Sequence, residues 1–576
     1  MSKLHQIGHQ MFDLFFRHYI VGAFLLTVVT SFIQCGVYYA YNGELFYTDT
    51  DCYTRALRII DWLSDFQWAE KMFPYYNPPH GFELHFTRIC DVIWLFFTLP
   101  FLLFMPLKEA VFYGGMFFSP LFFGLSLATV LWGLKPYLPS NKNKQLIFML
   151  FALIALCLLG KLINVFGFHR PDHHSLMCFI GCAVVAITLR NQIKPNINLL
   201  FWLGVLCGCG MWASSAIEGL FVVAFVLGSL AINRIFYRHN AKELLYYGIG
   251  LFLSVTFSWL VNPALGGYGV LDISRLSVIH VVLTALMMLA FWALAWLRTD
   301  NKFALICGFG GAAAVCAVLM LLIFGTQNLF TPIYNTEVYD VFVYRITEMK
   351  PQSLLEYETP SFVFGLLLIG TLMYLSRFKQ SYAVHLLFFF CWTAFAALIC
   401  KRLYPYYVAV FVFLYGIGWF LLMFKTDKSD KYKFFALLYV LIPIFYLNTF
   451  YAAPKRLSIP PMKENALLNL FYAPELMFYQ NIDTVGGPYH SNIEGVIDNY
   501  HLWFSKDEAE VTALLKKHNV HSIYVKYDEN LEPEKHTDQL FGQIMSGKNL
   551  YKWLIKIEDC HYEIDYDILE KQLNLH

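Results

Sequence analysis

Charged residues are scarce in this chain of 576 residues: Asp, Glu, Lys and Arg make up 14% of it, against about 25% in ordinary soluble proteins. Hydrophobic residues reach 58% and the mean hydropathy is +0.51, so a water-soluble core could not bury them all. The net charge is only +1, which excludes the strong basic field that gathers nucleic acid. The composition therefore predicts an all-α polytopic protein whose excess apolar surface faces membrane lipid.

Cysteine patterns typical of zinc sites are also missing. The 13 cysteines form no CxxC pair and no Cys/His spacing of the kind that holds zinc. Most of them are therefore predicted to be small core residues. Cys52 and Cys90 flank one polar segment, and the sequence leaves open whether they form a disulfide.

Thirteen apolar runs are long enough to cross a membrane as helices: 19–40, 110–134, 145–166, 175–190, 197–213, 217–234, 244–262, 277–297, 303–325, 360–376, 382–400, 404–424 and 434–452. A further run, 91–107, is short and contains two prolines. If it does not cross and the N-terminus lies inside, six loops that carry Lys or Arg all fall on the cytoplasmic side, as the positive-inside rule requires. We therefore predict a re-entrant or interfacial helix at 91–107.

This topology divides the chain into a transmembrane domain, 1–452, and a small soluble extracytoplasmic α/β domain, 453–576. It places external loop 1 (41–109) and external loop 5 (326–359) on the same side as the tail. In the tail, residues 505–508 are predicted to cap an amphipathic helix that ends at Lys517 and precedes a strand at 520–525.

Ionisable groups recur on this outer side. Asp49 and Asp51 follow the first span with Arg55 close behind, and two carboxylates at that spacing can share a divalent cation or divide metal binding and proton transfer. Asp172 and His174 stand at the start of the fourth span, where such groups usually line a wet cavity or bind an ion. The alternatives are an acidic interface loop at the first position and a helix cap at the second.

Two further places complete the set. Glu348 lies in external loop 5, and Arg402 stands two residues before Tyr404 at the outer mouth of a later span. Taken singly, a loop carboxylate is most often solvated, and an Arg at that depth is ordinary at a membrane interface. Taken together, carboxylates and an imidazole suit a metal and a guanidinium suits an anion, as transfer from a lipid-phosphate donor requires.

The order of these motifs resembles that of the oligosaccharyltransferase catalytic subunit, within the GT-C superfamily of glycosyltransferases that use polyprenyl-linked sugars. The positions that match fall within roughly residues 40–405: Asp49 with Arg55, Asp172-His173-His174, the segment 346–351, and Arg402. The resemblance implies Mg²⁺ or Mn²⁺ bound by Asp49, Asp172, His174 and Glu348. It also implies contact with the donor phosphate from Arg402, to which we add Arg55 and Tyr404, and catalytic roles for Asp49 and Glu348. Asp51 has no fixed role in the family, and we assign it a supporting catalytic role.

The implied activity is inverting transfer of a sugar or oligosaccharide from a polyprenyl (pyro)phosphate carrier, on the extracytoplasmic face of what would be a bacterial inner membrane. The chain has no Trp-Trp pair, whereas the family's Trp-Trp-Asp motif reads a protein acceptor; it has Gly-Gly-Pro-Tyr-His-Ser-Asn at 486–492 instead. A glycan or glycolipid acceptor is therefore favoured, with a protein acceptor as the alternative. A lipid-linked-sugar flippase would need ionisable groups at mid-span, whereas these sit at the outer ends of spans.

Overall fold

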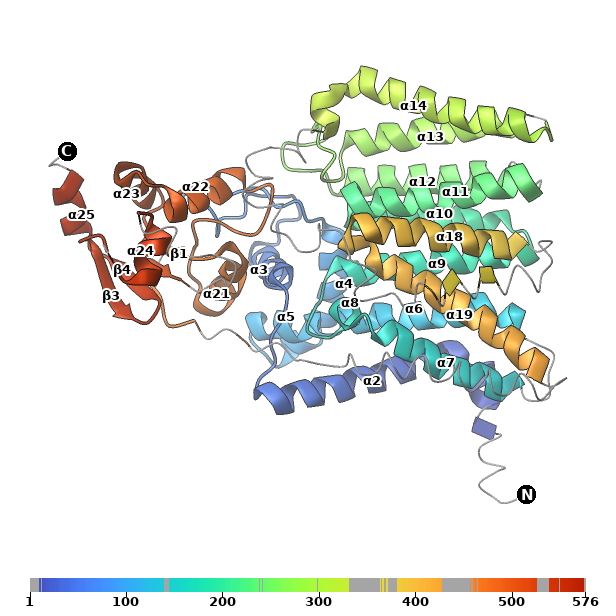
Figure 1. Ribbon diagram of the computed structural model, residues 1–576, viewed down its shortest axis with the longest axis horizontal. Helices are drawn as coiled ribbons and strands as arrows, with labels where there is room; N and C mark the ends of the chain where they lie inside the picture. The colour runs from blue at the N-terminus through green and yellow to red at the C-terminus, as the bar shows by residue number, and fades with distance from the viewer. Residues whose placement is uncertain are drawn as a thin grey trace. The chain divides into compact units, whose positions relative to one another are not determined.

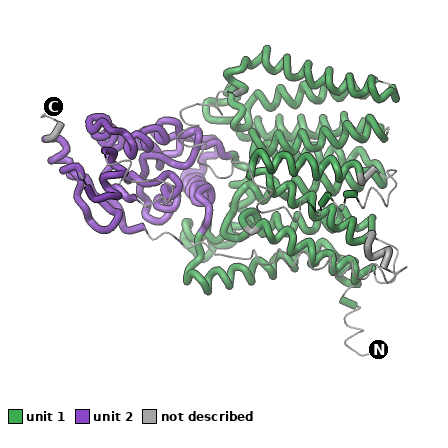
Figure 2. The backbone as a smooth tube through the Cα atoms, viewed as in Figure 1, with its two compact units in different colours: residues 1–46, 87–329, 348–454 green, residues 47–86, 330–347, 455–576 purple. Residues whose placement is uncertain are grey.

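Helices dominate the computed structural model (Figure 1). It describes residues 10–138, 144–330, 381–426, 456, 459–525 and 538–573, together with a few residues between 363 and 370. Within these ranges, the single positions 12, 238, 241, 298, 464 and 549 are not described. The chain forms two compact units (Figure 2). Unit 1 comprises residues 1–46, 87–329 and 348–454, and unit 2 comprises 47–86, 330–347 and 455–576.

The described part of unit 1 is helical throughout. Its α-helices are α2 (Tyr19–Asn42), α4 (Arg88–Thr98), α5 (Leu107–Gly115), α6 (Phe118–Leu134), α7 (Lys144–Gly160), α8 (Ile163–Phe166), α9 (His173–Ile193), α10 (Ile197–Ala213), α11 (Leu220–Tyr237), α12 (Lys242–Val261), α13 (Val278–Trp296), α14 (Lys302–Phe330), α18 (Ser381–Ile399) and α19 (Tyr404–Thr426). Within the described ranges, eight helical segments are long and apolar enough to cross a membrane. The protein is therefore an integral membrane protein of the α-helical class.

The predicted spans agree with these helices wherever the two can be compared. The predicted spans at 145–166, 197–213 and 382–400 correspond to shorter apolar helices, and the spans at 434–452 and most of 360–376 lie outside the described residues. The total of thirteen spans and the orientation stay predictions. The helix α4, which covers the start of the 91–107 run, has 11 residues. It is about 16 Å long, roughly half the hydrocarbon thickness, as a segment that does not cross would be.

Small residues allow the central helices of unit 1 to approach closely. A Cβ atom at Gly204 of α10 would collide with the backbone carbonyl of Tyr247 on α12, and one at Gly250 would collide with the carbonyl of Phe201. Close backbone approach at glycine is a common basis of helix packing in membranes. This contact fixes α10, which leads directly into the π-helical turn Ser215–Gly219 at the start of α11.

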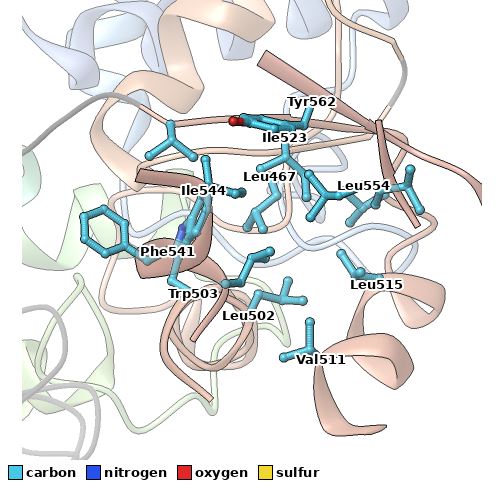
Figure 3. Packing of buried hydrophobic residues seen from close by; sticks show 14 of the residues in the cluster. Leu467, Leu502, Trp503, Val511, Leu515, Ile523, Phe541, Ile544, Leu554 and Tyr562 are labelled. Carbon is cyan, nitrogen blue, oxygen red and sulfur yellow. The ribbon is translucent and has the colours of Figure 1, made fainter. Parts of the chain in front are cut away.

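Unit 2 contains the tail and the loop 47–86. Its helices are α3 (Thr50–Asp65), α21 (Ala473–Gln480), α22 (Ile493–Phe504), α23 (Glu508–Lys517), α24 (Leu540–Ser546) and α25 (Tyr566–Leu573). Its strands are β1 (Ala466–Leu467), β2 (Ser522–Tyr524), β3 (Leu554–Glu558) and β4 (His561–Ile564), in the order β1-β2-β4-β3. β1 and β2 are parallel and the other neighbours are antiparallel. Helices and sheet share one apolar core that includes Leu502, Leu515 and Ile523 (Figure 3).

The helix and strand predicted in the tail are present as α23 and β2. Within the predicted capping segment, the cap is Asp507, whose side chain accepts a hydrogen bond from the backbone N–H of Ala509 at 2.9 Å. The structure also groups the loop 47–86 with the tail, because α3 packs against α21 and the backbone of Tyr75 and Asn77 pairs with Thr484. The functional division at residue 452 stays a prediction. Cys52 and Cys90 are both buried, and no disulfide joins them.

Candidate active site

The site in unit 1 is built where α9 begins. Asp172 precedes this helix in an extended conformation, and its Oδ1 accepts a hydrogen bond from the backbone N–H of His173 at 2.6 Å. Asp172 therefore caps α9, as the structural alternative for this residue proposed. Asp172, His173 and His174 are all buried, and each offers a ligand atom within 4.8 Å of the other two. Among the described residues, this is the group of side chains that could hold a metal ion.

His174 lies between two carboxylates. Its Nδ1 is 3.2 Å from the carboxylate of Glu218, and its Nε2 is 3.4 Å from Oδ2 of Asp172. Glu218 lies in the π-helical turn Ser215–Gly219, where the N–H of Gly219 bonds to the carbonyl of Ser214 at 2.8 Å. Such π-turns are rare and frequently occur at functional sites. The turn places Glu218, which is 1% exposed, beside His174.

His173 connects this pair to Arg402. Its Nδ1 is 2.5 Å from Oδ1 of Asp172, and its Nε2 is 2.7 Å from Nη2 of Arg402. A guanidinium can only donate, so Nε2 must be the acceptor, and the proton on this ring lies on Nδ1, facing Asp172. Both nitrogens of His173 are thus engaged, whereas His174 keeps Nε2 directed at the second oxygen of Asp172.

Arg402 is the part of the network that reaches the surface. Its side chain is 21% exposed, whereas that of Glu218, whose carboxylate lies 3.3 Å from the Arg402 Nε, is 1% exposed. The hydroxyl of Tyr406 also donates to Glu218, at 3.3 Å. A partly exposed guanidinium whose orientation is fixed by a buried carboxylate is suited to bind an anion such as phosphate.

Electrostatics keep Asp172 ionised. Burial raises the pKa of its carboxyl group, but electrostatic interactions with His173 and His174 and the hydrogen bond from His173 outweigh burial and hold that pKa well below its usual range. His169 lies three residues before Asp172 and is neutral, because burial and the charge of Arg170 lower its pKa to about 4. Its neutral ring stacks on Tyr38 with a centroid separation of 5.4 Å.

The residues at this site fit a divalent metal ion. Asp172 Oδ2 is buried and accepts no hydrogen bond from the residues that the structure describes, and it faces the Nε2 atom of His174 at 3.4 Å. Two neighbouring ligands at about 2.1 Å from an octahedral ion lie about 3 Å apart, so these atoms can bind the same ion after a small adjustment. One carboxylate and one imidazole with no thiolate suit Mg²⁺ or Mn²⁺ at least as well as zinc.

The other predicted site residues lie elsewhere. Asp49 and Asp51 are in unit 2, where Asp49 caps α3 by accepting from the backbone N–H of Asp51 at 3.1 Å. Arg55, one turn later on α3, is 1% exposed, and its guanidinium lies 4.3 Å from the ring centroid of Phe86. The participation of Asp49 in the metal site stays a prediction.

Two predicted residues remain. Glu348 is outside the described residues, and so are most of external loop 5 and the segment 346–351. Tyr404 begins α19, and its ring lies 5.9 Å from Nζ of Lys161. Glu218 and Tyr406 were not predicted as site residues from the sequence. The signal for Glu218 was available: it is a lone carboxylate at the edge of the apolar run 217–234, and ionisable groups inside a span are expensive unless they have a function.

Comparison with known proteins gives a clear result for structure and none for sequence. No protein-family model matches the chain, and no curated protein matches it. The archaeal oligosaccharyltransferase AglB from Archaeoglobus fulgidus, solved with an inhibitory peptide and a dolichol-phosphate, superposes with a TM-score of 0.64 at 14% identity, over 89% of this chain and 70% of that one.

Three further structures of the oligosaccharyltransferase from the same organism agree with it. The apo form has a TM-score of 0.60 at 16% identity, over 88% of this chain and 68% of that one. The complex with Zn and sulfate has a TM-score of 0.57 at 15% identity, over 88% of this chain and 67% of that one. The form tethered to an acceptor peptide containing the NVT sequon has a TM-score of 0.60 at 15% identity, over 89% of this chain and 69% of that one. The predicted resemblance is confirmed at the level of the fold: this chain has the fold of the archaeal oligosaccharyltransferase AglB, which is a GT-C fold.

Proposed function

We propose that this protein is a membrane glycosyltransferase that transfers a sugar or oligosaccharide from a polyprenyl phosphate or pyrophosphate carrier to a glycan or glycolipid. The observation that carries the proposal is the buried contact between a metal-binding pair and an anion-binding group: His173 joins Asp172 to Arg402 through hydrogen bonds of 2.5 and 2.7 Å. Departure of a sugar from its carrier leaves negative charge on phosphate. Groups already oriented toward that charge lower the barrier without reorganising during the reaction.

The residues of the site then have distinct roles. Asp172 and His174 hold the metal ion, which supplies Lewis-acid stabilisation of the departing phosphate when it is bound. Arg402, assisted by Tyr404, binds the phosphate of the donor and orients it. The roles of Asp49, Asp51 and Arg55 in catalysis and donor binding, and of Glu348 in completing the metal site, are proposed from the resemblance. Direct displacement by the acceptor inverts the anomeric carbon.

The proposed setting is the extracytoplasmic face of a bacterial inner membrane. This side follows from the six basic loops that the predicted topology places in the cytoplasm. Polyprenyl carriers reside in the bilayer, so a donor of this class can reach an integral membrane enzyme by lateral diffusion.

A protein acceptor is the second candidate. It is favoured by the similar structures, one of which holds an acceptor peptide with the NVT sequon. It is disfavoured by the absence of any Trp-Trp pair from this sequence. Incubating the purified protein with radiolabelled polyprenyl-linked sugars, and with either glycolipid extract or a sequon peptide, distinguishes the two. Label transferred to neither acceptor would refute the proposed activity.

Removal of divalent metal should abolish transfer. Asp172 and His174 supply two ligands from one buried site, and without the ion the charge on the departing phosphate is left to Arg402. We expect EDTA to lower activity to background, and Mn²⁺ or Mg²⁺ added in excess of the chelator to restore it. Turnover that persists after exhaustive chelation would show that the carboxylate and imidazole act without a metal.

Replacement of Arg402 with alanine should mainly weaken donor binding. The guanidinium offers charge-assisted hydrogen bonds to phosphate, and losing one costs about 1.5–3 kcal/mol, or roughly a 10- to 150-fold increase in donor Kd. A fluorescent polyprenyl phosphate provides the binding assay. Lys401→Ala is the matched control, because Lys401 is the adjacent, exposed cation. Equal weakening in both variants would indicate a general charge effect rather than a phosphate contact.

A further inference from the structure

Glu218 contacts His173, His174 and Arg402, and the description above gives it no role beyond the orientation of Arg402. It is 1% exposed, and its carboxylate lies 3.2 Å from the His174 Nδ1 and 3.3 Å from the Arg402 Nε. It also accepts hydrogen bonds from the hydroxyls of Ser214 and Tyr406, at 3.2 and 3.3 Å. Burying a carboxylate at the end of an apolar span is costly, so this arrangement needs several donors to be stable at all.

The geometry decides which nitrogen of His174 can bind metal. The oxygens of Glu218 accept hydrogen bonds from Arg402, Ser214 and Tyr406, so this group is an acceptor and the His174 Nδ1 carries the hydrogen that the two side chains share. In the neutral imidazole, the lone pair then lies on Nε2, the nitrogen that faces Asp172 Oδ2 at 3.4 Å. Histidines that bind metal usually donate their other N–H to a carboxylate or carbonyl, which fixes the tautomer and makes the ligand more basic.

We propose that Glu218 is a positioning residue that prepares His174 to bind the divalent ion through Nε2. This inference rests on the proposed metal site at Asp172 and His174, and it adds a residue that acts through a ligand without touching the ion. The same carboxylate orients the guanidinium of Arg402, so one buried group sets the geometry of both the metal ligand and the phosphate-binding side chain. The π-helical turn is the structural device that directs Glu218 inward.

The test measures Mn²⁺ binding to the purified full-length protein in detergent, with no donor or acceptor present. Free Mn²⁺ is followed by its electron paramagnetic resonance signal. For Glu218→Gln, which keeps the size of the side chain and removes its charge, we expect the Kd for Mn²⁺ to rise about 10- to 100-fold. For His174→Ala, which removes the ligand itself, we expect no measurable binding at this site.

Glu243→Gln is the matched control. Glu243 is a second buried carboxylate of unit 1, 3% exposed, and it is hydrogen-bonded to Asn191 at 3.1 Å and to His239 at 3.1 Å. It makes the same kind of helix-embedded contacts without touching the site. Its variant should bind Mn²⁺ like the wild type, and thermal unfolding of all variants reports any general loss of structure.

Each outcome separates the inference from the proposed function. Wild-type Mn²⁺ affinity in Glu218→Gln, or equal losses in the Glu218 and Glu243 variants, would overturn the positioning role and leave the metal site intact. A loss in Glu218→Gln as complete as that in His174→Ala would make Glu218 a direct ligand and also overturn the inference. Wild-type affinity in His174→Ala would overturn the proposed metal site itself, and the positioning role with it.

Discussion

Replacement of Asp49 with asparagine is expected to lower turnover by about 10²–10⁴-fold with little change in donor affinity. A sugar hydroxyl is a poor nucleophile, so an enzyme that glycosylates it needs a base positioned to accept its proton. Asparagine cannot accept that proton. It can still cap α3 as Asp49 does, by accepting from the backbone N–H of Asp51, so the local structure should survive. Single-turnover rates and donor Kd, measured on the same preparation, separate the two effects.

Asp65→Asn is a suitable control, because Asp65 lies at the other end of α3, where it pairs with Lys71 at 2.6 Å. That variant should turn over normally. Wild-type turnover in Asp49→Asn, together with slow turnover in Asp51→Asn, would transfer the role of base to Asp51. Retention of configuration in the product would contradict direct displacement altogether.

The spans were predictable because their cause is local. A bilayer demands about 20 consecutive apolar residues, and runs such as 173–193 and 278–296 satisfy this requirement within one stretch of chain. The grouping of residues 47–86 with the tail has a different cause. The backbone N–H of Asn77 bonds to the carbonyl of Thr484 at 3.0 Å, a contact between segments four hundred residues apart that no periodic pattern announces.

The site was predictable to the extent that its residues break an apolar pattern. Asp172, His174 and Arg402 interrupt or flank spans at visible cost, which is why they could be identified singly. Their arrangement could not be deduced, because it depends on Glu218, whose direction is set by a π-turn. Hydropathy and residue spacing predict ordinary α-helical periodicity. A π-turn adds one residue to a helical turn and so rotates the following side chains, and neither the hydropathy nor the spacing of the sequence reveals it.

A network of polar residues in unit 2 connects the loop 47–86 to the tail. His518 is fully buried, with Nδ1 lying 2.7 Å from the carbonyl oxygen of Pro78 and Nε2 lying 2.8 Å from Asp498. The imidazole therefore bridges a backbone carbonyl of the loop and a carboxylate of the tail, both of which accept hydrogen bonds. Lys517 supports the same carboxylate at 2.6 Å. The histidine therefore fastens the loop 47–86 to α22 of the tail.

Replacing His518 with alanine is expected to reduce the stability of this attachment by about 2–4 kcal/mol, since two polar contacts, one of them with a charged carboxylate, are lost from a buried site. Hydrogen exchange of the full-length protein should speed up at residues 77–81 and along α22, by about 30- to 900-fold if local opening governs exchange. His521→Ala is the control, since His521 is only partly buried and its ring packs at a tilt against that of Tyr566. Unchanged exchange at residues 77–81 in His518→Ala would contradict the fastening role.

Acid should remove much of this difference between wild type and His518→Ala. Burial raises the pKa of Asp498, but hydrogen bonds from His518 and Lys517 outweigh it and hold the pKa below its ordinary value of 3.8. A carboxyl group whose pKa is lowered in the folded state stabilises that state fully above its ordinary pKa, and the contribution is lost as pH falls through the folded value. Exchange compared at pH 7 and below pH 3, each corrected for its intrinsic rate, should therefore show a large effect of the substitution at neutral pH and a much smaller one in acid. An effect of equal size at both pH values would mean that packing of the imidazole, rather than its bond to an ionised Asp498, holds the loop in place.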